Sequence, residues 1–242
     1  MMGLQETLRK VGGEWVYVVA VALATAHVAW AASLLLEQYR YIGRIPSLEL
    51  FAALHMASAA LLAVGRKALG GGVSLAILVY YWLYVKPLEP VAEPQSVGLI
   101  FLSAALITGE VVRTQDINAA LLRISLAYPF LEWGLDAFRN PGHFIEFMQG
   151  NYLTSVLIPA HYLPYAAFIL GFIEVVLAVL LTLGIAVRRA SKVSAVVLLV
   201  FIIVAGYPLA LPQNIPLITA AYVLSLLGAG RFSLSRVFSS FS

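Results

Sequence analysis

The longest uncharged stretch of the chain sets the strongest limit on its fold. Residues 193–230 contain no Asp, Glu, Lys or Arg. This stretch is too long for a single helix that crosses a membrane, which needs about 20 apolar residues. Gly and Pro cluster near its middle, around Tyr207-Pro208, and both residue types interrupt helices. We therefore interpret the stretch as a hairpin of two membrane-spanning helices.

Six further apolar runs have the length of membrane-crossing helices. Turn-forming or basic residues bound them, such as Gly65-Arg66-Lys67 and Lys86-Pro87. The run Gly70-Gly71-Gly72 follows no strand and is interpreted as a turn at the start of the third span. With the hairpin, the predicted fold is an all-α, polytopic membrane helix bundle of about eight transmembrane helices. The six runs are residues 15–36, 46–64, 69–85, 94–112, 117–138 and 163–187.

The composition agrees with this fold. Apolar residues make up 62% of the chain and charged residues 11%, whereas an ordinary soluble domain has about a half and about a quarter. The chain contains no cysteine, which excludes disulfides, Fe–S clusters, thiolate zinc sites and cysteine nucleophiles. Absent Cys together with little Asn is typical of a thermophile.

The distribution of basic residues predicts the orientation in the cell membrane. Lys and Arg concentrate in the cytoplasmic loops of multi-pass proteins. With the N-terminus inside, ten basic residues lie in inner segments and four in outer segments, leaving out Arg123 within the fifth span. We therefore expect a cytoplasmic N-terminus at residues 1–14 and a cytoplasmic tail at residues 231–242. The inner residues are Arg9, Lys10, Arg66, Lys67, Arg113, Arg188, Arg189, Lys192, Arg231 and Arg236, and the outer ones are Arg40, Arg44, Lys86 and Arg139.

Landmarks recur in the same order in the two halves of the chain. His55 precedes Gly65 by ten residues, and Glu174 precedes Gly184 by ten, with basic residues following in each case. The next apolar runs then begin at Val73-Ser74 and Val193-Ser194. This order predicts two four-span units, residues 15–112 and 117–230, related by an axis along the membrane normal.

Ionisable side chains inside the spans are the first candidates for function, because each costs about 2.5–3.5 kcal/mol at the middle of a membrane. Tyr128, Glu132 and Asp136 follow one another at four-residue spacing and share one face of the fifth span. Glu174 stands alone in the sixth span, with Glu132 or Arg123 as candidate partners. We predict that the three acids line one pocket near the outer surface. The alternative is an ion-paired cluster, including Arg139, that only fixes helix packing.

The four histidines have no metal-motif spacing, so no metal site is predicted. His27 and His55 fall on adjacent antiparallel spans and can meet at one depth. Ordinary buried histidines with hydrogen-bond partners are the favoured interpretation, and paired haem ligation is the less favoured one. His143 and His161 flank the segment 140–162, which we interpret either as a short helix lying on the membrane or as a lid over the acids.

Two stretches of the second half resemble a known family. Residues 121–134, LLRISLAYPFLEWG, are similar to the first helix of the small four-span DoxX/DoxD membrane proteins. The sixth span, with Glu174 inside and Gly184 at its end, resembles their second helix. The resemblance covers residues 119–230. The first half is similar only through the internal repeat, and His55 stands there in place of the acid.

The resemblance implies a function that the composition does not show. Members of the family are linked to thiosulfate:quinone oxidoreductases and to quinol oxidase complexes. It implies a membrane subunit of such a quinone-linked complex, with lipid, other subunits and a quinone or small sulfur substrate as partners and no nucleic acid. The alternatives are a non-catalytic scaffold subunit and a small-solute transporter. Predicted catalytic residues are Glu132, Asp136 and Glu174, and predicted substrate-binding residues are Arg123, Tyr128, Arg139, His143 and His161.

Overall fold

The computed structural model describes residues 2–39, 41–88, 94–112, 114–205 and 210–235. Within these ranges the regular structure is helical and contains no strand, so the predicted all-α class is confirmed. The predicted turn at Tyr207-Pro208, part of the predicted tail, and three basic residues of the orientation argument, Arg40, Arg113 and Arg236, lie outside the described residues.

Each predicted span coincides with a helix. Seven of these helices begin and end within a few residues of the predicted spans. The eighth, α1, begins well before the predicted start at residue 15. The short helices α6 (Pro141–Gly150) and α7 (Tyr152–Leu157) fill the segment 140–162. The long helices are α1 (Met2–Leu35), α2 (Leu48–Ala63), α3 (Lys67–Tyr84), α4 (Pro94–Val111), α5 (Gln115–Arg139), α8 (Leu163–Leu183), α9 (Val187–Ala205) and α10 (Leu211–Leu227), and the 3₁₀ turns are Ile42–Arg44, Lys86–Leu88 and Ala160–Tyr162.

Two boundaries differ from the sequence interpretation because of glycine. The sixth span was expected to reach residue 187, but α8 ends at Leu183, since Gly184 adopts a left-handed conformation with φ of 73° and closes the helix. Gly70 lies inside α3 instead of forming a turn. A Cβ atom at Gly70 would come within 2.7 Å of Leu62 Cγ, so glycine lets α3 approach α2 closely.

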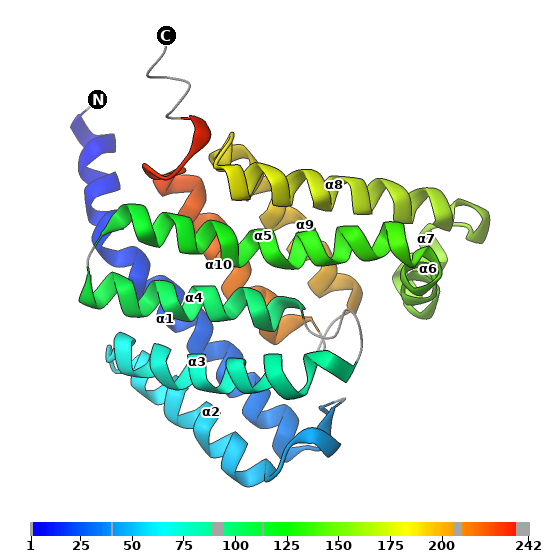
Figure 1. The fold of residues 1–242 in the computed structure, drawn as a ribbon, viewed down its shortest axis with the longest axis horizontal. Helices are drawn as coiled ribbons and strands as arrows, with labels where there is room; N and C mark the ends of the chain where they lie inside the picture. The colour runs from blue at the N-terminus through cyan, green and yellow to red at the C-terminus, as the bar shows by residue number, and fades with distance from the viewer. Residues whose placement is uncertain (1, 40, 89–93, 113, 206–209, 236–242) are drawn as a thin grey trace.

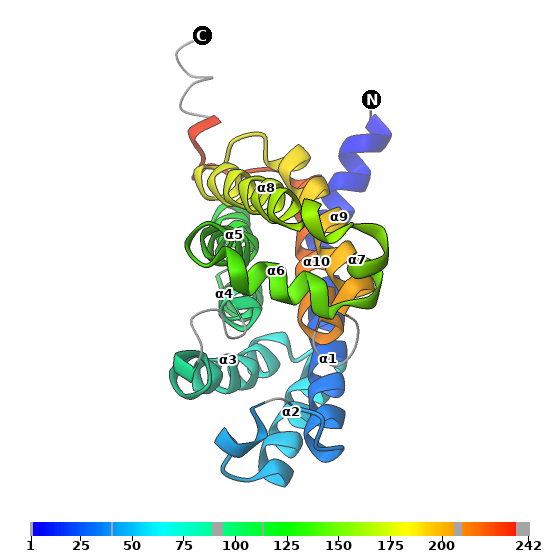
Figure 2. The same ribbon diagram turned by 90° about the vertical axis from the view of Figure 1, so that its right-hand side faces the viewer.

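The long helices pack in two rows of four. One row is α3, α4, α5 and α8, in that order, and Figure 2 shows it nearly end-on. The other row is α2, α1, α10 and α9, which cross the first row in Figure 1. The start of α1 and the last described residues lie at the same end of the molecule in both views.

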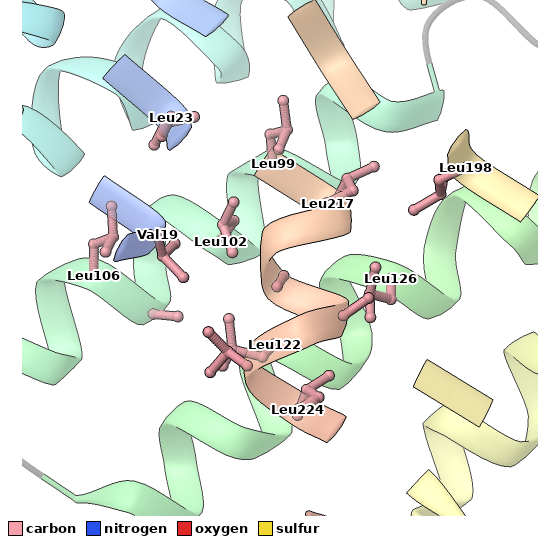
Figure 3. Packing of buried hydrophobic residues seen from close by; sticks show 14 of the residues in the cluster. Val19, Leu23, Leu99, Leu102, Leu106, Leu122, Leu126, Leu198, Leu217 and Leu224 are labelled. Carbon is pink, nitrogen blue, oxygen red and sulfur yellow. The ribbon is translucent and has the colours of Figure 1, made fainter. Parts of the chain in front are cut away.

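A leucine-rich core joins the two halves of the chain. Leu23 of α1 and Leu102 of α4 are completely buried, as are Leu122 of α5 and Leu224 of α10. Figure 3 shows these side chains converging between the rows. The halves therefore share one hydrophobic core and do not fold as separate bundles.

The surface of α8 is typical of a helix that lies in a membrane. Tyr165, Phe168, Ile169 and Phe172 are each more than half exposed, although an apolar patch of this kind is rare on a soluble monomer. By length and composition, Glu14–Leu35 and Ala160–Leu183 are able to cross a membrane, and three other apolar helices are shorter. The count of eight spans stays a prediction.

Candidate functional site

Glu132 contacts the first half of the chain. Lys86, two residues beyond the end of α3, donates a hydrogen bond to Glu132 in the second half of α5, and the two side chains form an ion pair. Their exposed fractions are only 14% and 16%. Tyr128, one helical turn earlier, also interacts with Glu132, in agreement with the predicted shared face. These contacts position Glu132 between the two halves.

Asp136 is tied to the segment that follows α5. Its carboxylate lies 2.7 Å from His143 Nδ1 and accepts a hydrogen bond of 2.9 Å from Asn140 Nδ2. The predicted partner Arg139 is exposed, and the contacts described for Asp136 are with His143 and Asn140. His161 is also exposed, and its ring packs on Tyr162.

The segment 140–162 lies across the end of α5 and α8, as Figure 2 shows. Phe144 and Met148 of α6 are buried against Ala137 of α5 and Ala167 of α8. On α7, by contrast, large apolar side chains are exposed: Tyr152, Val156 and Leu157. One apolar face packed on the helices and another open to the surroundings is the arrangement expected of a helix at the membrane surface.

Glu174 is the acid with the most unusual surroundings. Its side chain is completely buried in α8, which confirms that it faces the interior. Neither carboxylate oxygen has a hydrogen-bond partner in the described part of the chain. The expected partner Arg123 instead donates to the carbonyl of Leu181, at 3.5 Å, and to that of Phe232. Glu174 is thus a buried carboxyl group without a cation.

Helix α5 packs closely on α8 at Gly134, two residues after Glu132. A Cβ atom at Gly134 would come within 2.8 Å of the carbonyl oxygen of Gly171, so this face of α5 lies directly on α8. Two residues along a helix correspond to about 200° of rotation, so Glu132 lies on another side of α5. The contacts of the three acids therefore describe three separate surroundings.

Two buried serines of α9, like Glu174, lack a hydrogen-bond partner among the described residues. Ser191 and Ser194 are completely buried, and their hydroxyl groups have no partner among the described residues. At 1.5 Å per residue, Glu174 lies about 14 Å from the end of α8 and Ser194 about 10 Å from the start of α9. Buried polar groups in proteins nearly always bind something, often water or a ligand. This layer of the second half is therefore a candidate binding site.

The structure contains a cavity of about 570 Å³ elsewhere, where α5 and α9 begin and α10 ends. Its charged lining residues are Asp116, Arg188 and Arg189. None of the three predicted acids lines it.

A second polar cluster, in the first half, was largely missed by sequence reasoning. The Nδ1 atoms of His27 and His55 lie 2.8 Å apart. His27 Nε2 is 2.8 Å from the Ser74 hydroxyl, which is 2.8 Å from that of Ser103, and His55 Nε2 is 3.2 Å from the Tyr81 hydroxyl. The sequence predicts that the two histidines meet at one depth in the membrane. For the two serines, the only indication in the sequence is that each stands in an apolar run.

The histidine pair does not fit the ligation of haem in this conformation. Metal–nitrogen bonds of about 2.0–2.1 Å place two opposite ligands about 4 Å apart, whereas the facing nitrogens here are 2.8 Å apart. Nor do the described residues include a group of three or more His, Asp or Glu side chains able to hold a metal ion.

The helical fold, the apolar surface of α8 and the buried polar layers define a helical membrane protein. The model of the DoxX family matches residues 119–207, which confirms the resemblance predicted for the second half. The match extends from α5 to the end of α9 and stops before α10, earlier than expected. The part of the chain from α5 to α9 is therefore similar to the DoxX family of membrane proteins. No curated protein and no solved structure matches the chain significantly.

Proposed function

We propose that the protein is a membrane subunit of a quinone-linked redox complex, in which Glu174 holds and transfers a proton. The observation that carries this proposal is the buried Glu174 carboxyl group, neither oxygen of which has a hydrogen-bond partner among the described residues. An ionised carboxylate without a partner is very costly in such surroundings, so the group rests in its neutral, protonated form. A protonated carboxyl group can give its proton to a substrate and take it back.

Quinone chemistry needs such a group. Reduction of a quinone to a quinol consumes protons together with electrons, and oxidation releases them. A positioned carboxyl group is a common general acid or base for such a transfer. The hydroxyl groups of Ser191 and Ser194, buried on the neighbouring helix α9, supply further hydrogen-bonding capacity. Electrons come from a substrate or from a partner subunit.

The other predicted site residues take different parts in this proposal. Glu132 and Asp136 are engaged by Lys86 and His143 and act in positioning the helices. Arg123 links the end of α8 to the C-terminal segment through hydrogen bonds to a backbone carbonyl of each. Tyr128 supports Glu132. The exposed residues Arg139 and His161, at the outer end of α5 and α8, are available to a small anionic sulfur substrate such as thiosulfate.

The test is electron transfer in membranes that contain the assembled complex. Glu174→Gln keeps the size of the side chain and removes the exchangeable acid. We expect thiosulfate- or quinol-dependent electron transfer to fall strongly in this variant. Glu49→Gln makes the same chemical change at an exposed glutamate and serves as the matched control. Equal turnover of the Glu174→Gln variant and the wild-type protein contradicts the proposal.

The second candidate function is that of a non-catalytic scaffold subunit. The paired acids Glu132 and Asp136 and the exposed apolar surface of α8 favour it, because both serve packing and contact with a partner or lipid. The transporter alternative needs a wet cavity between the two halves. That interface is filled by leucines, as Figure 3 shows, so this alternative ranks last.

We also propose that the eight long helices cross the membrane as two repeats with both termini in the cytoplasm. Matching α1, α2, α3 and α4 with α5, α8, α9 and α10 exchanges the two rows of the fold, as a twofold axis does. His55 and Glu174 are both completely buried at matching positions, and so are Ser74 and Ser194. The start of α1 and the last described residues lie at the same end of the molecule. This arrangement supports the proposal that both termini are on the same side of the membrane.

A further inference from the structure

The buried cluster of the first half forms one continuous chain of hydrogen-bonding groups. In order, it contains Tyr81, His55, His27, Ser74 and Ser103, with neighbouring atoms 2.8 to 3.2 Å apart. These residues come from all four long helices of the first half. Their exposed fractions are between 0% and 2%, so bulk water does not compete for the hydrogen bonds. This chain lies outside the region matched by the DoxX family.

The chemistry of the five groups allows two complete donor patterns. In the first pattern Tyr81 donates to His55 Nε2, and His55 Nδ1–H donates to His27 Nδ1. His27 Nε2–H then donates to Ser74, and Ser74 donates to Ser103. In the second pattern every donor and acceptor is exchanged, and both histidines adopt the other neutral tautomer. Both patterns satisfy every link of the chain without any charged group.

We propose that this chain is a proton relay between the outer end of α3 and the middle of the first half. A neighbouring proton donor, a hydroxyl group or a water molecule, gives a proton to the Tyr81 oxygen as Tyr81 passes its own proton to His55. Each group then passes on one proton, and Ser103 releases one to a water molecule. One proton enters and one leaves, no electrons move, and the chain changes from the first pattern to the second.

The positions of the ends define the reach of the relay. Tyr81 is three residues from the end of α3, and Ser74 is seven residues earlier in the same helix. Seven residues correspond to about 10 Å along the helix axis. The relay thus covers about a third of a hydrocarbon core of roughly 30 Å. The rings of Trp30 and Tyr81 pack against His55. Reorientation of the hydroxyl groups and imidazole rings returns the chain to its first pattern, and the chain can then pass a further proton in the same direction.

Nuclear magnetic resonance of the full chain with ¹⁵N-labelled histidine tests the two patterns. The sequence contains only four histidines, and His143→Gln with His161→Gln leaves the two of the relay. Tyr81→Phe removes the partner of His55 Nε2, and Ser74→Ala removes that of His27 Nε2. A buried N–H group without a hydrogen-bond partner is rarer than a buried acceptor without one. In each variant, the Nε2 atom that has lost its partner should therefore carry no proton. The two variants should therefore hold opposite tautomers, with averaged signals in the unaltered pair. The same tautomer in both variants overturns the relay.

Proton flux into liposomes that contain the purified protein tests the transfer itself. After a pH difference is imposed, the wild-type protein should dissipate it faster than liposomes without protein. Tyr81→Phe should return the rate to the protein-free level. Tyr80→Phe is the matched control, because its hydroxyl group bonds the carbonyl of Arg44 and stands outside the chain. The relay is overturned if the wild-type rate equals that of empty liposomes, or if Tyr81→Phe conducts like the wild-type protein. Neither readout depends on quinone turnover, so the relay and the proposed function fail separately.

Discussion

Lys86 and Glu132 form an ion pair that joins the two halves of the chain across a separation of 46 residues. Both side chains are mostly buried, so neither charge is well solvated once its partner is removed. The pair adds to the close packing of α4 on α5, where Gly98 approaches the backbone of Ser125. It therefore helps to hold the two halves in register.

Removing the cation alone should be worse than removing both charges. We expect Lys86→Met to lower the free energy of unfolding in detergent by about 1–3 kcal/mol, below the roughly 3–5 kcal/mol of a fully buried pair. The double variant Lys86→Met, Glu132→Gln should recover part of the loss, because no buried charge is left alone. Unfolding curves of the single and double variants measure this, and additive losses would refute the interaction.

The close contact of α5 with α8 should be sensitive to a single methyl group. A Cβ atom at Gly134 would lie 2.7 Å from Val175 Cγ2, and one at Gly171 would lie 2.6 Å from Ala137 Cβ. Gly134→Ala and Gly171→Ala should each destabilise the protein by about 1–3 kcal/mol through overpacking.

Gly72→Ala is the control for this pair, because nothing lies within 4 Å of its added Cβ atom. It should be neutral or stabilising by up to about 1 kcal/mol, since alanine favours helix over glycine. The midpoints of thermal unfolding of the three variants test this prediction. Equal midpoints would show that α5 and α8 do not pack this closely.

If Glu174 serves a function, its presence should lower the stability of the folded protein. An apolar residue of similar size at this position removes a buried polar group that has no partner in the described part of the chain. We expect Glu174→Leu to raise the midpoint of thermal unfolding while it abolishes activity, the trade-off known from active sites. A lower midpoint would mean that Glu174 has a stabilising partner and belongs to the structure of the bundle.

The absence of cysteine makes the chain suitable for mapping its orientation. Single Gly43→Cys and Arg66→Cys variants place one thiol before α2 and one after it. With both termini in the cytoplasm, a maleimide that cannot cross membranes should label the Gly43→Cys variant in intact cells. The Arg66→Cys variant should react only after the cells are opened. The reverse pattern would contradict the proposed orientation.

Much of the fold was predictable because a membrane imposes a simple length rule on apolar helices. The exceptions arise where glycine controls local structure. Gly184 ends α8 early and allows Arg188 and Arg189 to enter the first turn of α9, which an apolar run does not reveal. Gly70 was taken for part of a turn because its tight packing against α2 depends on the tertiary structure.

The site was less predictable because helix rotation decides which polar groups meet. Spacing correctly grouped Tyr128 with Glu132, since both lie on one helix. It did not reveal that Lys86, far away in sequence, is the cation for Glu132. Nor did it show that Arg123 donates to the backbone carbonyls of Leu181 and Phe232, while Glu174 has no partner within the described ranges.

The most direct test of the central claim is the protonation of Glu174 during quinone turnover. Infrared difference spectra of the assembled complex, recorded as added quinone is reduced and reoxidised, report a protonated carboxyl group through its carbonyl band. We predict a band that changes with the redox state, disappears in Glu174→Gln and persists in Glu49→Gln. A difference spectrum that is the same in Glu174→Gln and in the wild-type protein would contradict the account and leave the scaffold function in its place.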